Sequence, residues 1–287
     1  MTKLLITGAN GQLGSEIKKI AGDFPELESL FTDVAELDIT HPEKVAAFLS
    51  ENQPAFLINC AAYTAVDKAE TDEETARLIN AVAVSILAEQ SAKINCRMVH
   101  ISTDYVFDGK ASRPYAEEAP VGPQSAYGRT KLEGEQLCLK NNPQSIIIRT
   151  SWLYSAFGNN FVKTMLRLGS ERGELRIVAD QVGCPTNAAD LARAVLTIIS
   201  SVVAGQKPFE AGIYHYSNEG ATSWYDFTVA ILEKAGLSCS VVPITTAEYP
   251  LPAPRPAYSV MDKSKIKRIF GIEIPHWEES LNNYFSK

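Results

Sequence analysis

Three glycines near the start of the chain constrain its fold more than any other feature. They form a G-x-x-G-x-x-G turn between a short apolar run, residues 3–7, and a helical pattern, residues 15–20. In such a unit the first glycine permits the tight turn, the second lets a pyrophosphate approach the backbone, and the third lets the helix pack on the strand. The N–H groups at the helix start then bind phosphate. The turn residues that we expect to contact a dinucleotide are Gly8, Gly11, Gln12, Leu13 and Gly14.

Strand patterns and helix patterns alternate from this turn to residue 150. The expected strands are residues 3–7, 27–33, 55–59, 97–102 and 145–150, and the expected helices are residues 15–20, 43–52, 71–94 and 126–140. This alternation predicts an α/β fold with a Rossmann-type, doubly wound parallel sheet, which binds ligands at the carboxyl ends of its strands. We expect residues 1–150 to form a dinucleotide-binding domain. Residues 151–287 then form a smaller, mainly substrate-binding α/β part that can exchange segments with the first.

Two aspartates mark the expected adenosine end of the cofactor site. Asp33 ends the second strand about twenty residues past the glycine turn, where an acidic residue bonds the ribose 2′-hydroxyl. This position favours NADH, and no arginine follows at once to hold a 2′-phosphate. Asp38 and Ile39 stand where such folds contact adenine, although Asp38 alternatively caps a turn. Small residues after the third strand allow close backbone approach, and the expected contacts there are Ala62, Tyr63 and Thr64.

A tyrosine and a lysine four residues apart suggest acid–base chemistry. Tyr127 and Lys131 share one face of a helix that begins at residue 126. A lysine cation beside a phenol lowers the tyrosine pKa, which would make Tyr127 a general acid or base. Thr103, at the tip of the fourth strand, can bond the same substrate oxygen. Chance alone gives about 0.6 such pairs in a chain of this composition, so the pair gains its weight from its place behind the glycine turn.

Charge and cysteine usage exclude several classes of function. The net charge is −7 and no basic stripe is visible, which argues against a nucleic-acid partner. No apolar run approaches the roughly 18 residues of a membrane span, and the N-terminus runs into a strand without a signal peptide. The five cysteines are scattered and the four histidines give no zinc spacing, so we expect a reduced, cytoplasmic protein without a metal site of this kind.

Longer motifs in a fixed order narrow the family. They are AAYTAVDKAE at 61–70, STDYVFDG at 102–109, RTSWLY at 149–154, GNNF at 158–161 and DQVGCPT at 180–186. Together with the glycine turn and the Tyr-x-x-x-Lys pair, they resemble the extended short-chain dehydrogenase/reductase superfamily. Within it they resemble the dTDP-4-dehydrorhamnose reductase family. The resemblance extends from residue 1 to residue 277.

The resemblance implies a reaction and a set of roles. Hydride would pass from NADPH, or from NADH, to carbon 4 of dTDP-4-dehydro-β-L-rhamnose, so the partner is a small nucleotide sugar. Tyr127 would donate the proton, Lys131 would bond the nicotinamide ribose, and Thr103 takes the place of the usual superfamily serine.

Three further residues match expected substrate contacts. Asp104 and Trp152 match contacts to the sugar nucleotide, although Trp152 alternatively packs in the core. Arg255 stands where it can clamp a diphosphate in bidentate fashion, although an arginine in a proline-rich loop is more often solvated.

Some members of the resembled family dimerise around magnesium held by glutamates. Glu16 matches one such position, but Ala189 stands where another glutamate is expected. Magnesium is therefore uncertain, and a monomer and a homodimer both stay open.

Two rival interpretations also remain. One is another nucleotide-sugar epimerase, dehydratase or reductase; dehydratases place an acidic pair after the catalytic threonine, whereas Thr103 is followed by the single acid Asp104. The other is a non-enzymatic, regulatory NADP-binding protein that resembles the β subunit of methionine adenosyltransferase. Intact Thr103, Tyr127 and Lys131 argue against a purely regulatory role.

Overall fold

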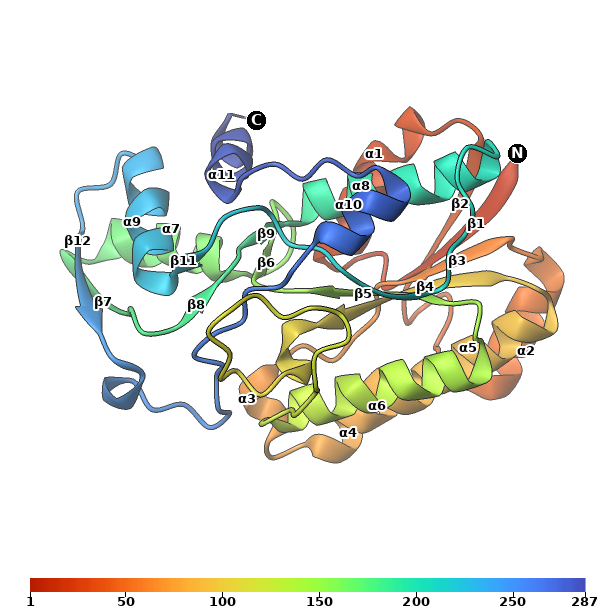
Figure 1. Cartoon of the computed structure of the whole chain (residues 1–287), viewed down its shortest axis with the longest axis horizontal. Coiled ribbons are helices and arrows are strands. Elements are labelled where there is room, and N and C mark those ends of the chain that lie inside the picture. The colour runs from red at the N-terminus through yellow and green to blue at the C-terminus, as the bar shows by residue number, and fades with distance from the viewer. Residues whose placement is uncertain (287) are drawn as a thin grey trace.

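The computed structural model describes residues 1–286 and is built around a six-stranded parallel sheet (Figure 1). The strand order is β10-β5-β4-β3-β1-β2. Because the chain leaves β1 for β2 on one side and later places β3 on the other, the sheet reverses its direction of growth at β1. Ligands bind such sheets at this switch point. The strands are β1 (Thr2–Thr7), β2 (Leu27–Thr32), β3 (Phe56–Asn59), β4 (Arg97–Thr103), β5 (Ile146–Thr150) and β10 (Gly212–His215).

The central strands are buried on both faces, as a parallel sheet requires. Every residue of β3 and β5 is buried, and the three consecutive isoleucines of β5 are at most 1% exposed. Strands covered on both faces favour continuous apolar runs over alternating ones. The predicted fold class, an α/β doubly wound sheet, is confirmed.

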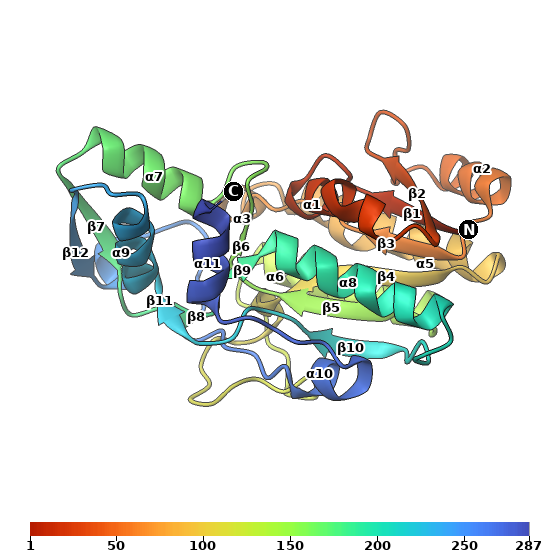
Figure 2. The ribbon, with the colours of Figure 1, turned by 90° about the horizontal axis from the view of Figure 1, so that it is seen from above.

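Helices cover both faces of the sheet (Figures 1 and 2). One face packs against α1 (Gln12–Ile20), α8 (Ala188–Val203) and α10 (Ser264–Phe270). The other face packs against α2 (Pro42–Asn52), α5 (Ala83–Lys93) and α6 (Ala126–Asn141). In α8 the buried Leu191, Val195 and Ile198 recur every three or four residues, which gives the helix the apolar stripe it turns to the sheet.

The helical stretch predicted over residues 71–94 is interrupted. A short helix α3 (Val66–Ala69) precedes α4 (Glu73–Arg77), and a π-helical turn η2 (Leu78–Val82) joins α4 to α5. Asn80 of η2 is fully buried, accepts from the Tyr63 backbone N–H at 2.9 Å and donates to the Tyr63 carbonyl at 3.1 Å. Turns of this kind often occur at functional sites. This turn fixes the loop that follows β3.

A smaller part lies beyond the carboxyl end of β5 (Figure 2). Its helices α7, α9 and α11 share an apolar cluster. Its elements are β6 (Leu153–Tyr154), α7 (Phe161–Glu171), β7 (Glu174–Val178), β8 (Val182–Gly183), β9 (Thr186–Asn187), β11 (Thr222–Ser223), α9 (Trp224–Lys234), β12 (Ser240–Ile244) and α11 (Trp277–Phe285), and the 3-10 turns of the chain are η1 (Ala21–Asp23), η3 (Asp104–Val106) and η4 (Thr246–Glu248). The chain after residue 150 also returns to the large sheet, where it supplies β10, α8 and α10.

The structure also bears on membrane-spanning helices and on the state of the cysteines. Among residues 1–286, no helix has both the length and the hydrophobicity that crossing a membrane requires. All five cysteines are free thiols.

Candidate active site

Two hydrogen bonds hold the start of α6, and a glycine lets it lie close to the turn that follows β4. The Ser125 side chain caps α6 by accepting from the Gly128 N–H at 3.1 Å, and the Glu70 carboxylate accepts from the Ala126 N–H at 2.8 Å. A Cβ on Gly128 would lie 2.3 Å from the carbonyl oxygen of Tyr105, so only glycine allows this approach. Tyr127 is therefore held in the first turn of α6, above the end of β4.

Thr103 and Tyr127 meet at this junction. The Thr103 hydroxyl lies near the Tyr127 phenol and acts to lower its pKa, and the Tyr105 ring packs edge-on against Tyr127 with 5.4 Å between ring centres. Burial is the largest effect on the Tyr127 pKa, which it raises to about 12. Tyr127 is thus a neutral phenol at neutral pH, with a second hydroxyl nearby.

Lys131 does not lower the Tyr127 pKa as the sequence predicted. Its side chain is 2% exposed, and its Nζ donates to the Ile101 carbonyl at 2.7 Å. Burial lowers the Lys131 pKa itself to about 8. Lys131 is not among the groups that shift the Tyr127 pKa; burial, which removes the solvation of the phenol, determines its direction, and the lysine bonds to a backbone carbonyl instead.

Asp104 is a buried carboxylate beside this pair. It is 2% exposed, and its Oδ1 accepts from the Thr103 hydroxyl at 3.0 Å. Burial raises the Asp104 pKa to about 6, against the opposing effects of the Thr103 and Ser259 hydroxyls. Its Oδ2 has no hydrogen-bond partner among residues 1–286. A buried carboxyl that titrates near neutrality beside a reactive tyrosine is typical of a functional site.

A cavity of about 420 Å³ lies at the switch point of the sheet. It is enclosed by the glycine turn and the loops after β2 and β3. Of the cofactor residues predicted from the sequence, six line it: Gly8, Gly11, Asp33, Asp38, Ile39 and Ala62. The lining also includes residues that the sequence analysis did not name, among them Asn10, Val34, Leu37, Thr40 and Cys60.

The three glycines of the turn have different surroundings. Gly8 has φ +65°, and a Cβ there would lie 2.6 Å from the Ala61 N. A Cβ on Gly14 would lie 2.4 Å from the Gly8 carbonyl oxygen, so glycine is required for helix and turn to meet. A Cβ on Gly11 would meet only the Gly8 carbonyl oxygen, at 3.3 Å, and would otherwise point into open space. The geometry therefore fits a dinucleotide whose pyrophosphate lies against Gly11.

The two predicted acidic contacts are held by backbone groups. The Asp33 carboxylate accepts from the Asn10 N–H at 2.9 Å and from the Val34 N–H at 2.8 Å. Asp38 accepts from both the backbone and the hydroxyl of Thr40, and these bonds lower its pKa. Asp38 thus has the turn-capping role named as its alternative while it also lines the cavity.

The remaining predicted cofactor residues lie outside the cavity lining. Leu13 belongs to the core under the sheet, and the Gln12 side chain accepts from Asn160 at 3.1 Å. Tyr63 bonds Asp72 with its hydroxyl and Asn80 with its backbone. Thr64 is not among the lining residues either.

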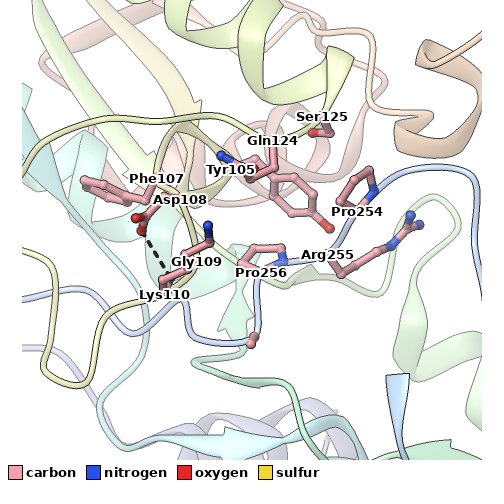
Figure 3. A pocket seen from close by; sticks show the side chains of 11 residues that line it. Tyr105, Phe107, Asp108, Gly109, Lys110, Gln124, Ser125, Pro254, Arg255 and Pro256 are labelled. Atoms are coloured by element: carbon pink, nitrogen blue, oxygen red, sulfur yellow. Dashed lines mark hydrogen bonds between the residues drawn. The ribbon is translucent and has the colours of Figure 1, made fainter. Parts of the chain in front are cut away.

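Arg255 lies at a second cavity, of about 250 Å³ (Figure 3). Its guanidinium makes a bidentate pair with Asp67, with Nη1–Oδ1 at 2.5 Å and Nη2–Oδ2 at 2.7 Å. The Tyr105 side chain, which also lines this cavity, points toward the loop that carries Arg255. The arginine is 18% exposed and so is not the solvated side chain named as its alternative. Asp67, its partner, was not predicted from the sequence.

Trp152 combines a strained backbone with extensive ring contacts. Its φ is 48°, a left-handed conformation that is rare for a bulky residue and is often found at functional sites. Its ring stacks on Trp224 with 3.5 Å between centres, and a Cβ on Gly183 would lie 2.6 Å from it. The same Cβ would lie 2.7 Å from the hydroxyl of Ser259, the neighbour of Asp104. Trp152 is therefore a packed residue at the border of the Asp104 site.

Comparisons with known proteins decide the family. The family model described as RmlD substrate binding domain matches residues 1–287. The chain belongs to this family.

A relative from Aggregatibacter actinomycetemcomitans, named dTDP-4-dehydrorhamnose reductase, is 44% identical and aligns over 99% of this chain and 98% of its own length. A solved dTDP-4-dehydrorhamnose reductase from Clostridium acetobutylicum superimposes with a TM-score of 0.93 at 47% identity, covering 99% of each chain. A solved dTDP-4-dehydrorhamnose reductase from Bacillus anthracis, in complex with NADP, gives 0.93 at 39% identity, covering 100% of this chain and 99% of its own.

The two positions at which the sequence left magnesium open differ in what they offer a metal ion. The Glu16 side chain is 3% exposed, and its Oε1 accepts from the Ser155 hydroxyl at 2.7 Å. Ala189, in the first turn of α8, offers no ligand. Within residues 1–286, no group of three or more acidic, histidine or cysteine side chains is arranged to hold a metal ion.

Two buried polar residues of this RmlD-family site were missed from the sequence. Asn59 is the last residue of β3, and His100 lies in β4 beside it in register. A polar residue inside an otherwise apolar strand pattern was the available signal, since buried polar groups need partners. Both lie between the cofactor cavity and Lys131.

Proposed function

We propose that this chain reduces the 4-keto group of dTDP-4-dehydro-β-L-rhamnose to give dTDP-β-L-rhamnose. The observation that carries the proposal is the placement of the Tyr127 phenol near the Thr103 hydroxyl, which is itself bonded to the buried Asp104 carboxylate. Membership of the RmlD family, with a reductase relative at 44% identity over nearly the whole length, supports this reaction and its place in dTDP-rhamnose biosynthesis. The chain acts as an NADP-dependent oxidoreductase.

The proton is donated by Tyr127. Because its pKa is about 12, the phenol keeps its proton in the resting site and can give it to an oxygen that gains negative charge. The Thr103 hydroxyl bonds the same oxygen and stabilises the developing charge. Bound nicotinamide supplies the hydride.

Three residues provide the nucleotide-sugar contacts in this proposal. Asp104 has a free carboxylate oxygen, Oδ2, which can accept from a sugar hydroxyl. The Trp152 ring, at the border of the Asp104 site, excludes water from the bound sugar. Arg255 lines the neighbouring cavity, where its guanidinium can contact a diphosphate while Asp67 orients it.

The cofactor proposal is NADPH, with NADH also accepted. The relative from Bacillus anthracis was solved with NADP, which supports NADPH. Asp33 lines the cavity and no lysine or arginine does, which supports tolerance of NADH, since a 2′-phosphate gains no cation there. We propose that Gly8, Gly11 and the N-terminus of α1 hold the pyrophosphate.

Incubation with NADPH and the 4-keto sugar nucleotide tests the reaction. We expect NADPH oxidation coupled to formation of the rhamnose nucleotide, and Tyr127→Phe should lower kcat by roughly 10²–10⁴-fold because it removes the proton donor. Tyr214→Phe is the matched control, since it deletes a buried hydroxyl of β10 whose one hydrogen-bond partner within residues 1–286 is the Glu210 carbonyl. Product with an inverted or dehydrated sugar would favour an epimerase or dehydratase, and no turnover would favour a regulatory protein.

Further properties belong to the same proposal. We propose a mainly dinucleotide-binding part over residues 1–150 and a mainly substrate-binding part over 151–287, with β10, α8 and α10 exchanged into the first. The free cysteines support a reducing, cytoplasmic location. The proposed partner is the sugar nucleotide, with no nucleic acid and no membrane, and the protein is a monomer or a homodimer.

A further inference from the structure

A buried row of hydrogen-bonding side chains leads from the sheet to Lys131. Asn59, the last residue of β3, and His100, in the middle of β4, are fully buried and lie side by side on neighbouring strands. The Asn59 Nδ2 lies 3.1 Å from the His100 Nδ1, and the His100 Nε2 lies 3.4 Å from the Lys131 Nζ. The proposed reaction so far gives these two residues no role.

The orientation of the Asn59 amide follows from its other two partners. Its Oδ1 accepts from the Ala61 backbone N–H at 3.2 Å and from the Thr7 hydroxyl at 2.7 Å. A backbone N–H can only donate, so the atom that faces Ala61 must be the oxygen. The Asn59 Nδ2 therefore faces His100 and donates to its Nδ1.

The amide in turn fixes the tautomer of His100. Burial and the nearby Lys131 lower the His100 pKa well below its usual value, so the ring is neutral and carries one proton. Because the Nδ1 accepts from Asn59, that proton resides on the Nε2. The Nε2–H then points at the Lys131 Nζ.

This arrangement suits an amine better than an ammonium. A neutral Lys131 can donate to the Ile101 carbonyl and accept from the His100 Nε2–H. A protonated Lys131 has donors only, so its ammonium would face another donor. The ring therefore disfavours the charged form of the lysine.

Other ionisable groups near Lys131 act in the opposite direction. Glu135 and Cys138 approach from its own helix and Cys60 approaches from the end of β3, and each favours the ammonium. The Glu135 carboxylate is itself engaged by Arg149 and by the Ser102 hydroxyl. Among these neighbours within residues 1–286, His100 presents an N–H donor to the lysine nitrogen.

We propose that Asn59 and His100 are positioning residues that keep Lys131 partly in its amine form at the working pH. The proposal rests on the proposed function, in which Tyr127, one turn before Lys131 on α6, donates the proton. It assigns the tuning of the lysine to a fixed histidine tautomer.

The His100 tautomer can be observed directly in the free protein. In ¹⁵N-histidine-labelled protein, long-range ¹H–¹⁵N spectra distinguish a protonated ring nitrogen from an unprotonated one, and His100→Phe assigns the signal. We expect an unprotonated Nδ1 and a protonated Nε2. The reverse tautomer, or a charged ring at neutral pH, overturns the proposal. The tautomer is measured on the unsubstituted protein, and His100→Phe is needed only to assign the signal.

The effect on Lys131 is tested with a double-mutant cycle. Protein with ¹³Cε-labelled lysine is titrated, and Lys131→Met identifies the Lys131 signal. Asn59→Leu frees the Nδ1 to take the proton, so the Nε2 can accept from the lysine. We expect the Lys131 pKa to rise by about one pH unit, the size of one gained hydrogen bond to a charged group.

Two comparisons distinguish a Lys131 pKa shift caused by the His100 tautomer from one caused by a general perturbation of the structure. In the His100→Phe background, Asn59→Leu should leave the Lys131 pKa unchanged, because no ring remains to switch its tautomer. Thr7→Val removes the other side-chain partner of Asn59 and should also leave it unchanged. A shift that persists without the histidine overturns the proposal. Neither measurement uses substrate, so failure to reduce the keto sugar would reject the proposed function without changing this result.

Discussion

The substitution Asp104→Asn should stabilise the fold and impair activity, and the stabilisation should depend on pH. Burial raises the Asp104 pKa from 3.8 to about 6. A carboxyl with a raised folded pKa binds more protons in the folded state, so it costs stability as the pH rises from its unfolded value through its folded value. The ionised side chain, which is 2% exposed, therefore destabilises the fold above pH 6. Asparagine keeps the size of the side chain and removes the charge.

The magnitude follows from the two pKa values. The shift of about two pH units corresponds to about 3 kcal/mol at pH 8, where the carboxyl is ionised in both states. At pH 4.5 the folded group is mostly protonated, and the same linkage gives a penalty of about 1 kcal/mol. The gain from Asp104→Asn should therefore grow by about 2 kcal/mol between pH 4.5 and pH 8.

Urea denaturation of the ligand-free protein at several pH values measures this gain. Asp108→Asn is a matched control in the same loop, because the Tyr115 hydroxyl lowers the Asp108 pKa and its replacement should cost stability above the usual carboxyl range. Turnover by Asp104→Asn should fall, since the substrate contact is weakened. A gain in stability that is equal at both pH values, or a loss that grows with pH, would refute the reasoning.

Three further outcomes follow from the geometry. Gly14→Ala should abolish cofactor binding in a fluorescence titration because its Cβ would lie 2.4 Å from a carbonyl oxygen of the turn, whereas Gly22→Ala, with no atom within 4 Å, should bind normally. Trp152→Ala should raise KM and lower kcat/KM, and because its ring is stacked a thermal melt should also show a loss, smaller than the roughly 3–5 kcal/mol of a fully buried tryptophan. Glu135→Gln leaves the buried Arg149 without its counter-charge, so urea denaturation should show a loss of about 3–5 kcal/mol.

Asp104 and Glu135 are both buried carboxylates of this region, but their hydrogen bonding differs. Both Glu135 oxygens have partners, Arg149 and the Ser102 hydroxyl. Asp104 keeps one oxygen without a partner at the place where the reactive hydroxyls meet. Such a carboxylate lowers the stability of the fold, as is expected of a side chain whose role is to bind the substrate.

Local patterns in the sequence were enough to predict the central sheet and the position of the cofactor cavity. The glycine turn, the apolar strands and the Tyr-x-x-x-Lys pair each involve only a few neighbouring residues, so spacing alone predicts their conformation. This is why β1, α1 and α6 and the strands that carry Thr103 and Asn59 were found close to their true bounds. The same reasoning placed the switch point, where the glycine turn and Asp33 line one cavity.

Only the tertiary structure decided what depends on residues far apart in the chain. It pairs β10 with β5, Arg255 with Asp67 and Trp152 with Trp224, and no spacing rule connects these partners. It also reversed the expected direction of the Tyr127 pKa, because a pKa depends on burial and on the charges that the fold brings near. The sequence determines local conformation and which reactive side chains the chain contains. The burial of those side chains and their contacts with distant residues are set only when the sheet, its helices and the smaller part pack together.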